Sequence, residues 1–133
     1  MIRYITGNIL ESNAKALINT VNTVGVMGKG IALQFKKAYH NNFKTYVEAC
    51  KRNEIEIGKL LVTKDSNLNS GEKYIINFPT KKDWRKPSEY YFIESGLDDL
   101  IRVLNENKID SVAIPPLGAG NGGREWEKGK KII

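Results

Sequence analysis

Residues 20–32 read TVNTVGVMGKGIA, a glycine-rich stretch between two apolar segments. The apolar run Ala16–Val21 before it predicts a buried strand, and the residues from Gly30 onward have the spacing of a helix. A loop that joins a strand to a helix in this way presents backbone N–H groups to an anion. The stretch therefore predicts an α/β fold with an anion-binding loop.

A second glycine loop occurs near the end of the chain. Ser111–Pro115 predicts another buried strand, which leads into LGAGNGG at residues 117–123. Ligands of α/β sheets bind at the ends of such strands, so the two loops together predict a site for a phosphate-bearing ligand. The first loop matches neither a dinucleotide-binding fingerprint nor a P-loop. Leu33 stands where the fingerprint needs its third glycine, and Ile31 and Ala32 stand where a P-loop needs lysine and serine or threonine.

The remaining periodicity predicts a mixed sheet with helices on both faces. Further strands are expected at Ile2–Ile5, at Leu60–Thr63, and at Lys73–Phe78, where Pro79 would end the strand; Asp65–Gly71 is expected to form a turn. Helices are expected at residues 30–39, 42–53 and 88–105, the last with Phe92, Ile93, Leu97, Leu100, Ile101 and Leu104 on its apolar face. The order β-β-α-α-β-β-α-β indicates one α/β domain.

Composition narrows the kinds of protein and of site that the chain can be. The 133 residues suffice for one domain, and no apolar run reaches the ~18 residues that cross a bilayer. A single cysteine, Cys50, and a single histidine, His40, exclude an intrachain disulfide and a cysteine or multi-histidine metal cluster. With no signal-peptide pattern at residues 1–10, we expect a cytoplasmic protein without cofactor or metal. The net charge of +6 favours a polyanionic partner.

The whole chain resembles the macrodomains, which bind ADP-ribose. Four segments carry the resemblance: Thr6–Ile9, Ala16–Asn22, Val26–Ala32 and Pro115–Gly123. The resemblance implies that Asn8 binds adenine at the position where the family usually has an acidic residue. It also implies that Ile9 contacts ADP-ribose and that Asn22 orients the distal ribose. The implied contacts to the rest of ADP-ribose are Thr20, Val26, Gly28, Lys29, Gly30, Ile31, Leu117, Gly118, Ala119, Gly120, Asn121 and Gly122.

A second segment resembles one group of macrodomains more specifically. Residues 77–85 read NFPTKKDWR, with Ser88 following, and are similar to DarG-type macrodomains. Those antitoxin domains remove ADP-ribose from thymidine in single-stranded DNA and reverse a DarT-type toxin. Asp83 and Ala119 depart from the usual histidine and cysteine. The resemblance implies that Trp84, Arg85 and Ser88 contact DNA, and an indole with a neighbouring guanidinium suits a stacked base beside a phosphate.

The bond to be broken joins the distal ribose to a thymine nitrogen and is expected to pass through an oxocarbenium-like state. The sequence has no convincing pair of carboxylates for this reaction, and Gly122 stands where some relatives carry an aspartate. Lys81 matches the catalytic lysine of the DarG-type domains. It could act as a cation on the leaving thymine or as a nucleophile, with Asn22 holding the attacking group in line.

Two alternative functions share the same loops. A non-catalytic ADP-ribose-binding module would leave Lys81 without a chemical role, and an ADP-ribose-1″-phosphate phosphatase would give none to Trp84 and Arg85. The macrodomains that the chain resembles also continue through one more helix and strand. The resemblance therefore implies that residues 1–133 form a macrodomain without its last helix–strand unit.

Overall fold

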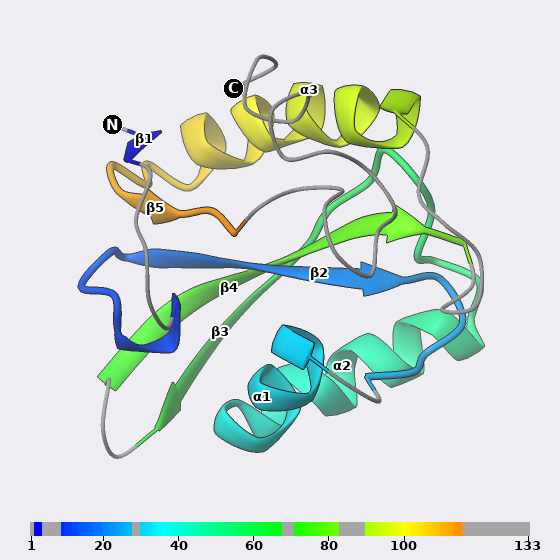
Figure 1. Cartoon of the computed structure of the whole chain (residues 1–133), viewed down its shortest axis with the longest axis horizontal. Helices are drawn as coiled ribbons and strands as arrows, with labels where there is room; N and C mark the ends of the chain where they lie inside the picture. Colours follow the sequence, from blue (N-terminus) through cyan, green and yellow to red (C-terminus); the bar gives the residue numbers. More distant parts are fainter. Residues whose placement is uncertain (1, 4–8, 28–29, 68–70, 83–89, 116–133) are drawn as a thin grey trace.

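The computed structural model of the chain describes residues 2–3, 9–27, 30–67, 71–82 and 90–115. In these segments five strands form one sheet in the order β1-β5-β2-β4-β3 (Figure 1). The first four strands of that order are parallel and β3 is antiparallel to β4, which confirms the predicted mixed sheet. The strands are β1 (Ile2–Arg3), β2 (Ala16–Asn22), β3 (Leu61–Asn67), β4 (Gly71–Lys81) and β5 (Val112–Ala113).

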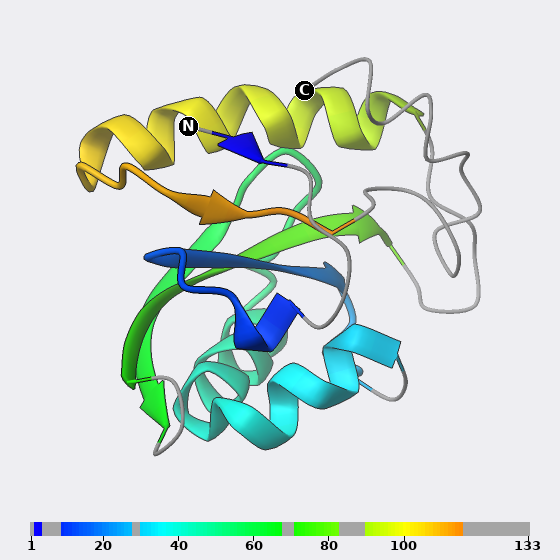
Figure 2. The same ribbon diagram turned by 60° about the vertical axis from the view of Figure 1, so that its left-hand side comes forward.

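The helices cover both faces of the sheet, as predicted (Figures 1 and 2). They are the 3-10 helix η1 (Ile9–Glu11) and the α-helices α1 (Gly30–Ala38), α2 (His40–Lys51) and α3 (Tyr90–Glu106). Within the described segments, no helix is both long and apolar enough to cross a membrane.

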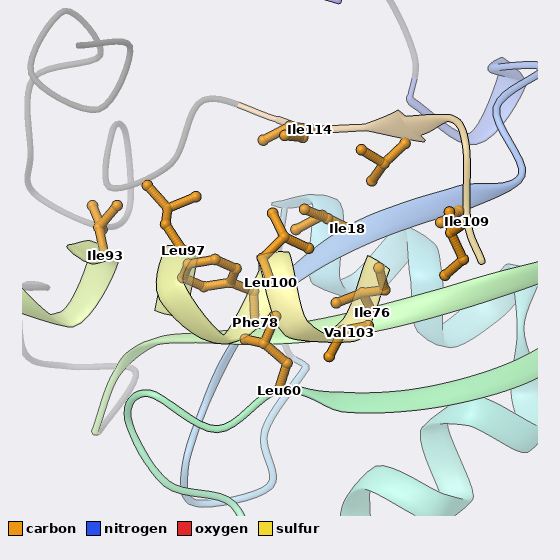
Figure 3. Packing of buried hydrophobic residues seen from close by; sticks show 12 residues of the cluster. Ile18, Leu60, Ile76, Phe78, Ile93, Leu97, Leu100, Val103, Ile109 and Ile114 are labelled. Atoms are coloured by element: carbon orange, nitrogen blue, oxygen red, sulfur yellow. The ribbon is translucent and has the colours of Figure 1, made fainter. Parts of the chain in front are cut away.

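Strand β2 has apolar side chains on both faces of the sheet, so helices must pack against each face. Ala16 and Ile18 pack in the cluster beneath α3, which Figure 3 shows with Phe78 and Leu100. Leu17 packs with Phe35 of α1 on the other face, and Val21 packs with Tyr46 of α2. Alternate residues thus enter different apolar cores, so the strand reads as one continuous hydrophobic run.

Strand β4 is longer than its sequence indicates. It continues through Pro79 to Lys81, so the expectation that Pro79 ends the strand is wrong. The pairing of β3 with β4 stops at Leu61 and Asn77, whereas β2 stays paired with β4 as far as Lys81. Pro79 has no N–H group, but at its position β4 has no hydrogen bond to β3 that could be lost. Sheets tolerate proline at such unpaired positions.

Strand β3 is also longer than expected. Asp65 to Asn67 belong to the strand and not to a turn, while residues 68–70 lie outside the described segments. The buried Asp65 carboxylate accepts a hydrogen bond of 2.8 Å from the Asn42 N–H in the first turn of α2. This hydrogen bond satisfies an N–H group in the first turn of α2 and gives the buried Asp65 carboxylate a partner, so a charged residue can lie within the sheet.

The predicted apolar face of α3 differs from the structure at two positions. Ile101 is 61% exposed, and Val103, which the prediction omitted, is buried in the core. The face is set by where the helix meets β4, and it runs from Phe92 and Ile93 through Leu100 to Val103.

Candidate active site

The ends of β2 and β4 bring the two expected catalytic residues together. Asn22 is the last residue of β2 and Lys81 the last of β4, and their Cα atoms are partners in the parallel pairing. A register irregularity between Val21 and Asn22 precedes this pair. Strand β5 is parallel to β2 on its other side, so its carboxyl end, where the second glycine loop begins, faces the same edge of the sheet.

The Asn22 side chain shapes the loop that follows it. Its Oδ1 atom accepts hydrogen bonds from the N–H groups of Val24, Gly25 and Val26 at 3.1, 3.1 and 3.3 Å. Its Nδ2 atom donates to the Val26 carbonyl at 2.8 Å. Gly25 adopts a φ of +90°, which glycine reaches without strain. One 5%-exposed side chain thus holds residues 24–26 in a single conformation.

Tyr46 of α2 supports Asn22 from below. The Tyr46 hydroxyl lies 2.8 Å from the Asn22 carbonyl oxygen and 3.0 Å from Asn22 Oδ1, and donates toward both. Burial raises the pKa of Tyr46 well above its usual value, so the hydroxyl keeps its proton. Cys50, one helical turn further on, packs against Gly25, and burial raises the pKa of its thiol as well.

The same loop is joined to the end of β4. The Thr23 hydroxyl donates to the Lys82 carbonyl at 2.7 Å, and the Thr23 N–H points to the same oxygen at 3.4 Å. The main chain on either side of the Asn22–Lys81 pair is therefore connected by hydrogen bonds. This connection fixes the backbone from which the Lys81 side chain starts.

The helix expected after the first glycine loop is present in the described residues. Helix α1 begins at Gly30, with Ile31 next, and has no acidic residue in its first turn. An anion at the end of the Gly28–Lys29 loop would meet the positive end of this helix dipole.

Three further expected contacts have described surroundings. Ile9 lies in η1, is 5% exposed and packs beside Leu17. Thr20 lies half-buried in β2, paired with Phe78 of β4. Val26 is 39% exposed on the loop that Asn22 shapes.

The other expected site residues lie outside the described segments. They are Asn8, Gly28, Lys29, Trp84, Arg85, Ser88, Leu117, Gly118, Ala119, Gly120, Asn121 and Gly122. Among the described residues, no cluster of three or more histidine, cysteine, aspartate or glutamate side chains could hold a metal ion.

In the sequence, Tyr46 falls with Phe43, Val47 and Cys50 on one apolar helix face, a pattern that predicts a core residue and no role in the site. The side chain does lie in the core, yet its hydroxyl reaches Asn22. A tyrosine on a fully buried helix face needs a hydrogen-bond partner, and that requirement is the signal that could have identified it. Val24, which is 50% exposed beside the site, carries no such signal in the sequence.

Comparison with known proteins agrees with this geometry. The family model described as "Macro domain" matches residues 18–133. The chain is 58% identical over 127 residues to the DNA ADP-ribosyl glycohydrolase of Mycobacterium tuberculosis, covering 96% of this chain and 36% of that protein. A solved structure of the macrodomain of Mycobacterium tuberculosis DarG has a TM-score of 0.93 at 56% identity, covering 98% of this chain and 86% of that one.

More distant relatives combine two activities. A DNA ADP-ribosyl transferase–DNA ADP-ribosyl glycohydrolase fusion protein of Thermosipho africanus is 38% identical over 136 residues, which cover 92% of this chain and 35% of the fusion. Thermosipho africanus DarTG in complex with ADP-ribose has a TM-score of 0.89 at 33% identity, covering 98% of this chain and 37% of that one. The chain thus spans about a third of the length of the curated relatives that it matches.

Proposed function

Because the chain belongs to the macrodomain family and, within it, to the DarG macrodomains, we propose that it is an ADP-ribosyl glycohydrolase that removes ADP-ribose from thymidine in single-stranded DNA. The observation that carries this proposal is the pairing of Asn22 with Lys81 at the ends of two neighbouring strands. This backbone pairing supports a site in which the Asn22 amide shapes the loop and the Lys81 amine acts on the scissile bond.

The proposed reaction divides between these groups. The glycine loops and the start of α1 hold the diphosphate through backbone N–H groups, which are already oriented before the substrate arrives. Asn22 keeps the loop beside the distal ribose in shape through its four hydrogen bonds to residues 24–26. Lys81 acts at the bond between the ribose and the base, as a cation on the leaving thymine or as an uncharged nucleophile.

The relatives support the substrate and a partner. The 58%-identical protein is a DNA ADP-ribosyl glycohydrolase, and the Thermosipho fusion joins such an enzyme to a DNA ADP-ribosyl transferase. We therefore propose that this chain reverses the action of a DarT-type toxin and associates with it, in the cytoplasm, where both would meet DNA. Trp84, Arg85 and Ser88 remain the proposed DNA contacts.

The test replaces Lys81 by alanine and uses an oligonucleotide that carries ADP-ribose on one thymine. Lys81→Ala should abolish release of ADP-ribose while the affinity for free ADP-ribose, measured by calorimetry, stays within a few-fold. Lys82→Ala is the matched control, because it removes the neighbouring, exposed lysine and keeps the carbonyl that Thr23 contacts.

Three results would contradict the proposal in different ways. A wild-type protein that binds ADP-ribose but releases none from the oligonucleotide would be a non-catalytic binding module. One that instead hydrolyses ADP-ribose-1″-phosphate would be the phosphatase. Near-normal turnover by Lys81→Ala would assign the chemistry to another group.

A further inference from the structure

Apolar side chains at the surface are few in the described segments, and two of them lie at the site. The exposed large hydrophobic residues are Val24, Val26, Tyr91 and Ile101. Val24 is 50% exposed and Val26 39% exposed, and both belong to the loop that Asn22 holds. Single exposed apolar residues are ordinary, but two on one rigid loop beside a reaction centre call for a ligand with an apolar surface.

Residues 24–26 are the part of the first glycine loop whose N–H groups are already engaged, so we assign the diphosphate to the N–H groups of the residues that follow. The N–H groups of residues 24, 25 and 26 already donate to Asn22 Oδ1, and the Val26 carbonyl accepts from Asn22 Nδ2. Tyr46 and Cys50 support the loop from the core. With these N–H groups engaged, the exposed side chains that residues 24–26 offer to a ligand are the two valines.

The hydrogen bonds of the loop indicate which part of the substrate lies near the valines. Thr23 joins the loop to Lys82, next to Lys81 at the end of β4. Lys81 is the residue proposed to act on the bond between the distal ribose and its base. The apolar ring that we expect nearest the valines is thus the base attached to the distal ribose.

Resting on the proposed function, we infer that Val24 is a specificity-determining residue that packs against the leaving thymine and its 5-methyl group. A branched apolar side chain is a suitable partner for that methyl, as apolar contacts to thymine are in DNA recognition generally. The contact aligns the base with Lys81 and favours thymine over a base that lacks the methyl. Val26 extends the same apolar surface.

The experiment compares two substrates and two variants. The substrates are oligonucleotides with ADP-ribose on the same ring nitrogen of either thymine or uracil, which lacks the 5-methyl group. Val24→Ala should lower kcat/KM on the thymine substrate about tenfold, the loss expected for two buried methyl groups, and should bring the thymine-to-uracil preference close to one. Val24→Thr keeps the branched shape and should also reduce that preference.

Binding of free ADP-ribose separates this role from a structural one, because free ADP-ribose has no thymine. Its affinity should change less than twofold in Val24→Ala, and Ile101→Ala, an exposed apolar residue of α3, should change neither activity nor preference. An unchanged thymine-to-uracil ratio, or an equal loss of ADP-ribose affinity, would overturn the inference. A wild-type protein inactive on both oligonucleotides would instead overturn the proposed function.

Discussion

At the scale of single residues, the site depends on side chains that hold other side chains. Asn22 uses its whole amide to shape residues 24–26, and Tyr46 in turn holds Asn22 through both its carbonyl and its side-chain oxygen. The hydroxyl lies in the core, where a hydrogen bond is stronger and its loss more costly than at the surface.

Tyr46→Phe is expected to lower the free energy of unfolding by about 1–2 kcal/mol, because the Asn22 oxygens lose a buried donor. The loop should also lose its fixed shape, so ADP-ribose affinity should fall severalfold. Denaturant unfolding and calorimetry measure the two effects. Tyr91→Phe is the control, since Tyr91 is 52% exposed. A Tyr46→Phe protein with wild-type stability and affinity would show that the hydroxyl supports nothing.

At the scale of elements, α3 approaches β4 closely at one point. Gly96 faces the ring of Phe78, and a Cβ added at Gly96 would overlap that ring. The glycine allows the helix to lie on the large aromatic side chain in the core cluster that Figure 3 shows. Since β4 carries Lys81 at its end, this contact also sets the position of the strand that reaches the site.

Gly96→Ala should therefore destabilise the protein by about 1–3 kcal/mol through overpacking, although alanine favours a helix by up to about 1 kcal/mol over glycine. Thermal unfolding measures the change. Glu94→Ala, on the exposed side of α3, should have little effect. Adding Phe78→Leu to Gly96→Ala should recover part of the loss, because the smaller side chain makes room. If Gly96→Ala is as stable as wild type, the close contact is not a constraint.

At the scale of the whole molecule, the supports of the site link stability to alkaline pH. Burial raises the pKa of both Tyr46 and Cys50, so the folded protein holds these protons more tightly than the unfolded chain does. Above the unfolded pKa of such a group, the unfolded state binds fewer protons, and the free energy of unfolding falls as pH rises.

The free energy of unfolding should thus decline above about pH 9, first through Cys50 and then through Tyr46, whose ordinary pKa is 10.0. Denaturant unfolding between pH 7 and 10.5 gives the slope. Cys50→Ala should make the free energy of unfolding fall less steeply near pH 9. A Cys50→Ala/Tyr46→Phe protein should also show a smaller fall near pH 10. Identical slopes in wild type and in the double variant would show that neither group is linked to folding.

The sequence by itself determined the class of fold, the order of the elements and the start of α1 at Gly30. These follow from local properties: the apolar period of each segment and the glycines that interrupt it. It also indicated that each glycine loop follows a strand. Because those two strands are parallel, their carboxyl ends lie at the same edge of the sheet.

Only the tertiary structure decided where Lys81 and Tyr46 lie. The sequence pattern predicts that a strand ends at Pro79. In the structure β4 continues to Lys81, because β3 pairs with β4 only as far as Asn77 and needs no N–H from Pro79. This extension makes Lys81 the pairing partner of Asn22. The sequence pattern predicts that Tyr46 is a core residue. Its hydroxyl donates a hydrogen bond to Asn22 because α2 packs on the sheet beside the end of β2. Both depend on contacts between segments far apart in the chain, which local patterns do not encode.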